Sequence, residues 1–256
     1  MLAAPVAPPM IEAVLSSEDM TRRLAAEIAV LLIPGDVVTL SGGLGSGKTT
    51  FARALIRHLA GDPGVEVPSP TFTLVQTYDL PQFPLAHIDL YRVGGEGELI
   101  ELGIGDLLEG GVGLIEWPER GAGALPEATI GIALALAPEH GPDARRVCIT
   151  ASRPLPETLS RFFNFNRFLQ EAGFGRARRA PIQGDASTRI YERLERDDRT
   201  AILMIAPRRP DGPPVRDGKP YSRIAHLAED VLPFVAMARG LRQRGLSAPE
   251  VLAADL

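Results

Sequence analysis

The N-terminal part of the chain alternates between short apolar runs and stretches in which apolar residues recur with helical spacing. A helical pattern follows Ser16–Asp19, whose hydroxyl and acidic side chains are typical of a helix N-terminus, and it stops before Pro34. The run 37–40 is apolar and mostly β-branched, which predicts a buried strand, and a second helical pattern covers residues 49–59. This order of strand, glycine-rich turn and helix is typical of the opening of an α/β domain.

Later apolar runs extend the predicted sheet. Further strands are predicted at 73–78, 85–89, 112–116, 130–136 and 146–151. A helical pattern around residues 97–108 separates two of them. Because little helical sequence separates the last two strands, we expect them to form an antiparallel hairpin at the edge of the sheet.

A second pattern follows Pro154–Pro156, where two prolines suggest a boundary. It predicts a helix over 157–171, an antiparallel meander of three strands, a loop over 208–220 and a long amphipathic helix over 221–244. The three strands are predicted at 176–182, 189–196 and 200–206, with Gly184–Ser187 at the first turn. We therefore expect a disordered leader at 1–10, an α/β domain at 11–152 and an α+β domain at 153–256.

Charge also changes sign between these two domains. Residues 1–152 carry 9 basic and 19 acidic side chains, whereas residues 153–256 carry 18 basic and 13 acidic ones. Such an asymmetry is typical of two units with different origins. The 45% of hydrophobic residues suffices for buried cores.

The sequence lacks the features that mark secreted and membrane-spanning proteins. Cys148 is the single cysteine, so an intramolecular disulfide is excluded. No apolar run reaches the roughly 18–20 residues of a membrane span, and the first residues lack the basic start of a signal peptide. These features predict a cytoplasmic protein.

Residues 42–49 carry the clearest chemical signal. Their sequence, Gly-Gly-Leu-Gly-Ser-Gly-Lys-Thr, fits the P-loop pattern G-x-x-x-x-G-K-[ST], with a predicted strand before it and a helix after it. Glycines let successive backbone N–H groups curl into an anion-binding nest at the helix N-terminus. Lys48 is one of only two lysines in the chain and is expected on the β- and γ-phosphates, with Thr49 as a ligand of Mg²⁺.

Two carboxylates follow predicted strands and are expected beside this loop. Asp89 and Glu116 each end a strand, where a carboxylate can hold Mg²⁺ or orient the attacking water. The alternative for Asp89 is a helix cap or turn. Trp117 can stack on a base or pack in the core. His87 has no second ligand at metal spacing, so no zinc role is expected.

A P-loop identifies a nucleotide-binding protein but not its reaction. An ATPase releases inorganic phosphate, whereas a small-molecule kinase, the first alternative, phosphorylates an added acceptor. A scaffold that uses nucleotide only to order an interface is the second alternative. Such a scaffold would need Lys48 but not Glu116.

Five segments in this order resemble one family. They are Gly-Gly-Leu-Gly-Ser-Gly-Lys-Thr-Thr-Phe at 42–51, Ser-Pro-Thr-Phe-Thr-Leu-Val at 69–75, His-Ile-Asp-Leu-Tyr-Arg at 87–92, Glu-Leu and Leu-Gly within 98–103, and Ile-Glu-Trp-Pro-Glu at 115–119. Together they resemble the TsaE (YjeE) family of P-loop ATPases, over about residues 10–152. The resemblance implies slow ATP hydrolysis in the bacterial machinery that makes threonylcarbamoyladenosine beside the tRNA anticodon.

The resemblance also implies the partners and the site. The partners are a TsaD-type transferase and its TsaB-type companion, with tRNA contacted only indirectly, and the cofactors are ATP and Mg²⁺. The implied catalytic residues are Lys48, Glu116, Asp89 and Thr71, and the implied metal ligands are Thr49, Glu116 and Asp89. The implied nucleotide-binding residues are Gly42, Gly43, Gly45, Ser46, Gly47, Lys48, Thr49, Thr50, Trp117 and Glu18. The family usually has aspartate where this chain has Gly43, which removes one carboxylate and leaves the phosphate nest in place.

The second domain resembles the N-terminal lobe of aminoglycoside-phosphotransferase-like kinases, in particular bacterial amino-sugar kinases. The resemblance is carried by Gly-Asp-Ala-Ser at 184–187, Ile-Leu-Met at 202–204 and Gly-Leu-Ser-Ala-Pro at 245–249. The third predicted strand lacks the lysine that kinases use on the α- and β-phosphates. No catalytic-loop aspartate follows, so the resemblance implies an incomplete and inactive lobe, either in a truncated copy of a two-enzyme fusion or as a remnant lobe.

Overall fold

The computed structural model describes residues 10–101, 103–121, 123–183, 189–206, 213–220, 224 and 230–256. Two compact units, Met1–Phe163 and Asn164–Leu256, make up the chain and are described separately. This division falls inside one helix, whereas the sequence predicted a boundary after residue 152. The assignment of functional domains stays a prediction.

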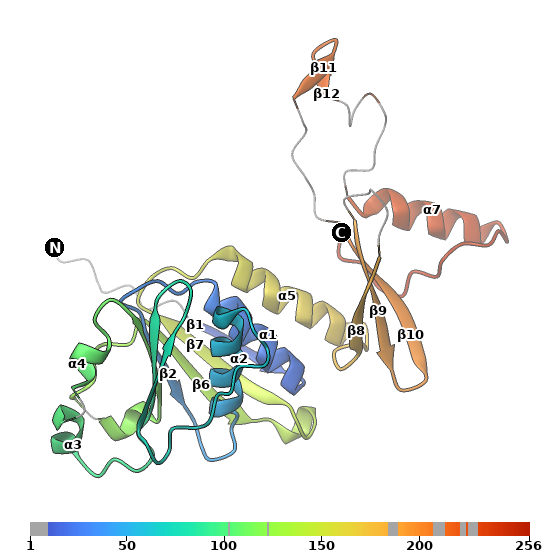
Figure 1. The fold of residues 1–256 in the computed structure, drawn as a ribbon. Coiled ribbons are helices and arrows are strands. Elements are labelled where there is room, and N and C mark those ends of the chain that lie inside the picture. Colours follow the sequence, from blue (N-terminus) through green and yellow to red (C-terminus); the bar gives the residue numbers. More distant parts are fainter. Residues whose placement is uncertain are drawn as a thin grey trace, which may run out of the picture. The chain divides into compact units, whose positions relative to one another are not determined.

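A seven-stranded sheet is the centre of the first unit (Figure 1). Its strands are β1 (Met10–Leu15), β2 (Val37–Ser41), β3 (Val75–Asp79), β4 (Pro84–Asp89), β5 (Val112–Glu116), β6 (Ile130–Leu136) and β7 (Arg145–Ala151). The spatial order is β1-β7-β6-β2-β5-β4-β3. The four central strands β6, β2, β5 and β4 run parallel. β7 pairs antiparallel with β6, β3 pairs antiparallel with β4, and β1 pairs antiparallel with β7 at the edge. The predicted α/β class is therefore confirmed for this unit.

Helices cover both faces of this sheet. They are α1 (Glu18–Ala29), α2 (Lys48–Ala60), α3 (Glu96–Glu101), α4 (Ile104–Leu107) and the first turns of α5 (Glu157–Glu171), with two short 3-10 helices at Pro118–Gly121 and Pro138–His140. Alternate residues of the strands enter two cores. Val38 and Leu114 join the core under α1 and α2, and Val37 and Ile115 join the core that includes residues of α3 and α4.

The first strand was not expected from the sequence. The leader was predicted to include Met10, but Met10 begins β1, which pairs antiparallel with β7. The prediction that β6 and β7 form an antiparallel hairpin is confirmed, but its place at the sheet edge is wrong, because β1 occupies that edge. Pairing of β1 with β7 joins residues more than a hundred positions apart, and local sequence does not encode it.

The helix expected around 97–108 is broken in the structure. α3 ends at Glu101 and α4 starts at Ile104, with Gly103 between them. Gly103 has φ of +59°, the left-handed conformation that glycine adopts without steric cost. Such a residue interrupts the hydrogen-bonding pattern of a helix, which explains the two shorter helices.

The second unit contains the predicted meander. Its strands β8 (Arg178–Ile182), β9 (Ile190–Arg196) and β10 (Arg199–Ile205) pair antiparallel in the order β10-β9-β8. The last turns of α5 contribute Leu169 to a small core with Phe174, Leu194 and Leu203. A two-stranded ladder of β11 (Pro214–Arg216) and β12 (Lys219–Pro220) lies within the segment 208–220 that was predicted as a loop.

The last helix is shorter than predicted. α7 covers Leu232–Gln243, whereas the sequence pattern predicted a helix over 221–244. Pro233 lies in its first turn, where proline lacks only an N–H that would have no partner in the helix. Residues 221–223 and 225–229, like the predicted turn at 184–187, lie outside the described residues.

An ion pair between the buried Asp36 and the partly exposed Arg153 holds the start of β2 in the first unit. Both terminal nitrogens of Arg153 donate to the Asp36 carboxylate, at 2.8 and 2.7 Å, and one also donates to the Leu31 carbonyl at 2.9 Å. Burial acts to raise the pKa of Asp36. Hydrogen bonds from Arg153, the Ile33 N–H and Thr129 outweigh it and hold that pKa below its ordinary value. The strand that leads into the glycine-rich loop is therefore fixed at its base.

We expect Arg153→Ala to reduce the free energy of unfolding by roughly 3 kcal/mol at pH 7, because it leaves Asp36 buried without its counter-ion. A carboxylate with a lowered pKa stabilises the fold above the unfolded-state pKa, and this contribution is lost as pH falls through the folded-state value. The difference between variant and wild type should therefore shrink as the pH is lowered from 7 to 3 in urea titrations. Arg161→Ala, which removes an exposed pair with Glu157, is the control and should change stability by about 0.5 kcal/mol or less. Equal effects of the two substitutions would contradict the role given to Arg153.

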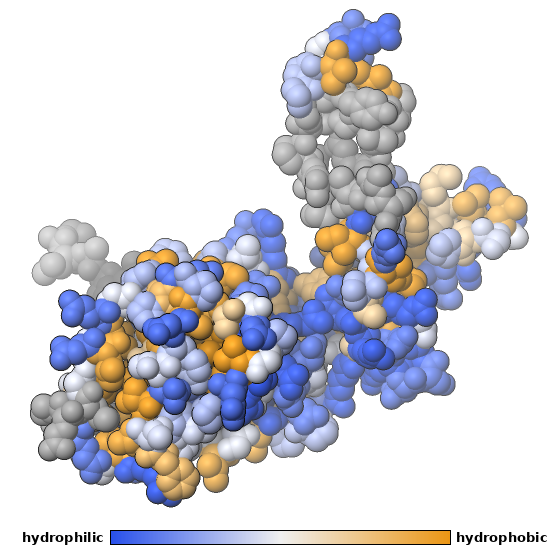
Figure 2. Space-filling model, viewed as in Figure 1, coloured by the Kyte–Doolittle hydropathy of each residue, from blue (hydrophilic) through white to orange (hydrophobic). Residues whose placement is uncertain are grey.

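Within the described residues, no helix is long and apolar enough to cross a membrane. Figure 2 shows hydrophilic and hydrophobic residues interspersed over the visible face of the first unit.

Candidate nucleotide-binding site

The glycine-rich loop joins the end of β2 to the N-terminus of α2. Gly42, Gly45 and Gly47 have φ of +132°, +74° and +106°, conformations that residues with a Cβ rarely adopt. Gly47 is the N-cap of α2, and its cap position carries no side-chain hydrogen bond. The helix N-terminus therefore presents backbone N–H groups toward the loop, which is the arrangement that binds phosphate.

Two adjacent glycines of this loop make a matched pair for mutation. A Cβ on Gly42 would lie 2.0 Å from the Leu134 carbonyl oxygen, whereas a Cβ on Gly43 would have no atom within 4 Å. We expect Gly42→Ala to distort the loop, with a loss of stability of about 1–3 kcal/mol and of most nucleotide affinity. Gly43→Ala and Gly43→Asp should leave both nearly unchanged. Chemical denaturation and nucleotide titration of the three variants test this, and equal behaviour at 42 and 43 would contradict it.

Lys48 lies buried inside the loop. Its Nζ donates to the carbonyl oxygens of Gly42 and Gly43, at 2.7 and 2.9 Å, and lies 3.6 Å from the centre of the Trp117 ring. Burial lowers the pKa of Lys48, and the carboxylates of Glu116 and Glu119 partly oppose this shift. The ammonium group is therefore poorly solvated and favours an added anion.

Glu116 connects the loop to the interior of the sheet. Its Oε2 accepts a hydrogen bond from the Thr49 hydroxyl at 3.0 Å, and its Oε1 lies 2.9 Å from Nε2 of His87. An ionised carboxylate only accepts hydrogen bonds, so Nε2 of His87 is the donor. His87 is fully buried, and its Nδ1 has no hydrogen-bond partner among the described residues. This contact fixes the orientation of the Glu116 carboxylate at the end of β5.

Asp89 has a separate set of partners at the end of β4. Its Oδ2 accepts from the hydroxyls of Ser69 and Thr71, at 3.0 and 2.8 Å, and its Oδ1 accepts from the Tyr91 N–H at 2.9 Å. Asp89 is also the register partner of Glu116 in the parallel pair β4–β5. The loop that carries Thr71 is thus tied to a carboxylate beside Glu116.

The aromatic side chain of Trp117 lies at the phosphate end of this site. It contacts the Lys48 ammonium and also packs on Tyr91, with ring centres 5.0 Å apart. The φ of +60° at Trp117 is unusual for a residue with a side chain, and the backbone N–H of Trp117 donates to the Leu40 carbonyl. The strained turn after β5 therefore directs the indole toward the glycine-rich loop.

A small hollow borders the other end of the loop. It is lined by Glu18, Thr21, Gly47, Thr50, Asp143 and Arg145. Nε of Arg145 donates to the Ser46 carbonyl at 2.9 Å, which holds the loop from the side of β7. Glu18 and Thr50, both expected to contact nucleotide, are thus brought together next to Gly47.

The structure brings Lys48, Thr49, Asp89 and Glu116 together at the carboxyl ends of β2, β5 and β4, which are adjacent in the sheet. Glu18 and Thr50 line the separate hollow beside Gly47. Sequence reasoning missed Ser69, His87 and Arg145. His87 could have been found from its spacing, because residues two apart in a strand share a face, and Asp89 was already assigned to the site. Arg145 had no local signal, since its contact with the loop joins residues 99 positions apart.

The fold and this site define a P-loop nucleotide-binding protein. The sequence profile of the family described as "Threonylcarbamoyl adenosine biosynthesis protein TsaE" matches residues 15–147, just over half of the chain. The chain belongs to the TsaE family.

Two relatives of this chain bear the name of this family. A protein of Rickettsia bellii is 39% identical over 137 residues, which are 54% of this chain and 92% of that protein. One of Bacillus subtilis is 37% identical over 153 residues, which are 57% of this chain and 91% of that protein. Both are named "tRNA threonylcarbamoyladenosine biosynthesis protein TsaE". The solved structure titled "Crystal structure of Bacillus subtilus YdiB" is 28% identical with a TM-score of 0.47, and it covers 63% of this chain and 99% of that one.

Proposed function

We propose that the chain binds ATP with Mg²⁺ and hydrolyses it slowly in support of threonylcarbamoylation of the adenosine next to the tRNA anticodon. Its family and its relatives give the protein a role in tRNA threonylcarbamoyladenosine biosynthesis. The observation that carries the finer proposal is the hydrogen-bonded set Thr49–Glu116–His87 beside the glycine-rich loop.

The donor set fits Mg²⁺. The Thr49 hydroxyl and the Glu116 carboxylate are in contact, and the Asp89 carboxylate ends the neighbouring strand, so hard oxygen ligands converge on one side of the loop. Among the described residues, no group of three or more His, Cys, Asp or Glu side chains forms a protein cage for a metal. Mg²⁺ in P-loop sites takes its other ligands from phosphates and water. When bound, it would supply a positive charge to the phosphate oxygens.

The chain's own residues would position and neutralise the triphosphate. The loop N–H groups would hold phosphate oxygens, and Lys48 would exchange the Gly42 and Gly43 carbonyls for β- and γ-phosphate oxygens. Glu116, oriented by His87, would hold the Thr49 hydroxyl and align the attacking water. Ser69 and Thr71 would respond to the presence or loss of the γ-phosphate through their hydrogen bonds to Asp89. Positioning and electrostatics dominate phosphoryl transfer, so small changes in the positions of these groups would control the rate of ATP hydrolysis.

We further propose that the TsaD-type transferase and the TsaB-type companion fix the positions of these groups, and that they do so in the cytoplasm. The slow basal hydrolysis that we propose would then accelerate in their presence. Measurement of phosphate release from ATP, with and without the two partners, tests this. Release that does not respond to the partners would contradict their proposed role, and phosphate that appears on an added small acceptor would favour the kinase alternative.

For the second unit we propose an N-terminal lobe like that of aminoglycoside-phosphotransferase-like kinases, without kinase activity. The antiparallel order β10-β9-β8 supports this proposal, because kinase N-lobes are built on such a meander. Strand β10, Arg199–Ile205, has no lysine to hold the α- and β-phosphates.

A further inference from the structure

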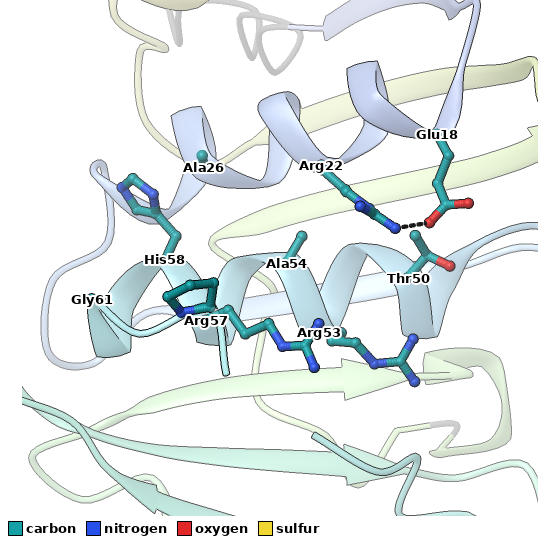
Figure 3. Close-up of a pocket in the computed structure, with 10 residues that line it drawn as sticks. Glu18, Arg22, Ala26, Thr50, Arg53, Ala54, Arg57, His58 and Gly61 are labelled. Carbon is teal, nitrogen blue, oxygen red and sulfur yellow. Dashed lines mark hydrogen bonds and ion pairs between the residues drawn. The ribbon is translucent and has the colours of Figure 1, made fainter. Parts of the chain in front are cut away.

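A groove separates the exposed sides of α1 and α2 in the first unit (Figure 3). Its volume is about 560 Å³, and its lining alternates cationic and small side chains. The lining residues are Glu18, Arg22, Ala26, Thr50, Arg53, Ala54, Arg57, His58, Gly61 and Pro63. The alanines leave space between the helices for side chains of another molecule.

The arginines of this groove are held in place. Nε of Arg53 donates to the Val67 carbonyl at 3.2 Å, and Nε of Arg57 donates to the Val65 carbonyl at 3.0 Å. Figure 3 shows the two side chains extending in the same direction along α2. Their terminal nitrogens have no partner among the residues that the structure describes. Arginines fixed through Nε present a pre-organised fork to carboxylate or phosphate oxygens.

The charge of the groove is opposite to that of the unit that carries it. Residues 1–163 contain 11 lysines and arginines but 20 aspartates and glutamates. Three of those cations, Arg22, Arg53 and Arg57, line this single groove, and Glu18 is the one carboxylate in the lining. A concentration of positive charge on an otherwise acidic unit selects an anionic partner locally.

We propose that this groove is the docking site for an acidic segment of a partner protein. Its carboxylates would pair with Arg22, Arg53 and Arg57, and an apolar side chain between them would pack on Ala26 and Ala54. An RNA strand fits less well for two reasons. The lining contains no phenylalanine, tyrosine or tryptophan on which bases could stack, and the negative unit repels a long polyanion.

The position of the groove links this partner to nucleotide binding. One end is formed by Glu18 and Thr50, which also line the hollow that contains Gly47. Thr50 follows Thr49, whose hydroxyl contacts Glu116. A segment bound in the groove therefore touches the first turn of α2, and linkage requires that nucleotide and partner change each other's affinity equally. This inference rests on the proposed function, which names the TsaD-type and TsaB-type proteins as the partners.

Arg22 and Arg23 allow a matched test with the full chain. Each arginine forms an ion pair with an acidic residue one turn earlier, Glu18 or Asp19, but only Arg22 lines the groove. The purified pair of TsaD-type and TsaB-type proteins is titrated into wild type, Arg22→Glu and Arg23→Glu by calorimetry. We expect Arg22→Glu to weaken binding about tenfold or more, and Arg23→Glu to weaken it less than twofold. Arg57→Gln, which keeps a donor for the Val65 carbonyl, should also weaken binding. Affinity for an ATP analogue without partners should be the same in all variants.

The outcomes separate this inference from the proposed function. Wild-type protein that does not bind the pair contradicts the proposed function and removes the inference with it. Equal binding by Arg22→Glu, Arg23→Glu and wild type overturns the inference alone. A parallel titration with tRNA tests whether the groove binds RNA. Sedimentation of the chain by itself tests whether the groove binds a second copy of the chain. Loss of tRNA binding or of self-association in Arg22→Glu, with partner binding intact, would also overturn the proposal.

Discussion

Lys48→Met is expected to lower the affinity for ATP about 100-fold or more without destabilising the fold. The lysine Nζ contacts two loop carbonyls and the Trp117 ring, and phosphate oxygens would replace those carbonyls in the bound state. Each hydrogen bond to a charged group contributes roughly 1.5–3 kcal/mol, so loss of two of them exceeds a factor of 100. Methionine keeps the apolar stem against Trp117 and removes a buried charge. The melting temperature without nucleotide should therefore be unchanged or higher.

Calorimetric titration with a non-hydrolysable ATP analogue and Mg²⁺ measures this effect. The control is Lys219→Met, which changes the only other lysine of the chain, in β12 of the second unit. Affinity of Lys48→Met within threefold of wild type would contradict the assignment of Lys48 to phosphate.

Glu116→Gln should reduce partner-stimulated ATP hydrolysis about 100-fold, with a smaller effect on ATP affinity. Glutamine preserves the shape of the side chain but loses the charge. Its amide cannot accept hydrogen bonds at both ends from Thr49 and His87, as the carboxylate does. Glu116 would act both as a ligand of Mg²⁺ and as the group that orients the attacking water, so the substitution would weaken both functions together.

Glu119→Gln is the matched control for this substitution. Both carboxylates oppose the lowered pKa of Lys48, but Glu119 is exposed, and no hydrogen bond of its side chain to Thr49 or His87 is present. His87→Gln should give an intermediate loss, because it disturbs only the orientation of Glu116. Rates of phosphate release compare the three variants. A Glu119→Gln effect as large as that of Glu116→Gln would indicate that nearby negative charge alone matters.

Local sequence was sufficient for much of this fold. Strands β5 and β6 were predicted at their observed bounds, because both are continuous or alternating apolar runs between glycine and proline signals. The glycine-rich loop was also predicted, since its chemistry depends on eight consecutive residues. Helix α5 was predicted at its observed bounds as well.

Contacts between distant segments could not be read in the same way. The pairing of Met10–Leu15 with β7 depends on an edge that only the folded sheet provides. The contact of His87 with Glu116 depends on which parallel strands are neighbours, and that of Arg145 with the loop depends on the position of β7. The candidate carboxylates were predicted individually, but the hydrogen bonds that orient them belong to the tertiary structure.

The central claim is that nucleotide binding by this P-loop supports tRNA threonylcarbamoyladenosine formation. Cells depleted of their own TsaE-family protein would receive either this chain or its Lys48→Ala form, and the modified nucleoside in tRNA would be quantified by mass spectrometry. The account predicts that the wild-type chain restores threonylcarbamoyladenosine and that Lys48→Ala does not. Restoration by Lys48→Ala, or failure of a soluble, ATP-binding wild-type chain to restore the nucleoside, would contradict it.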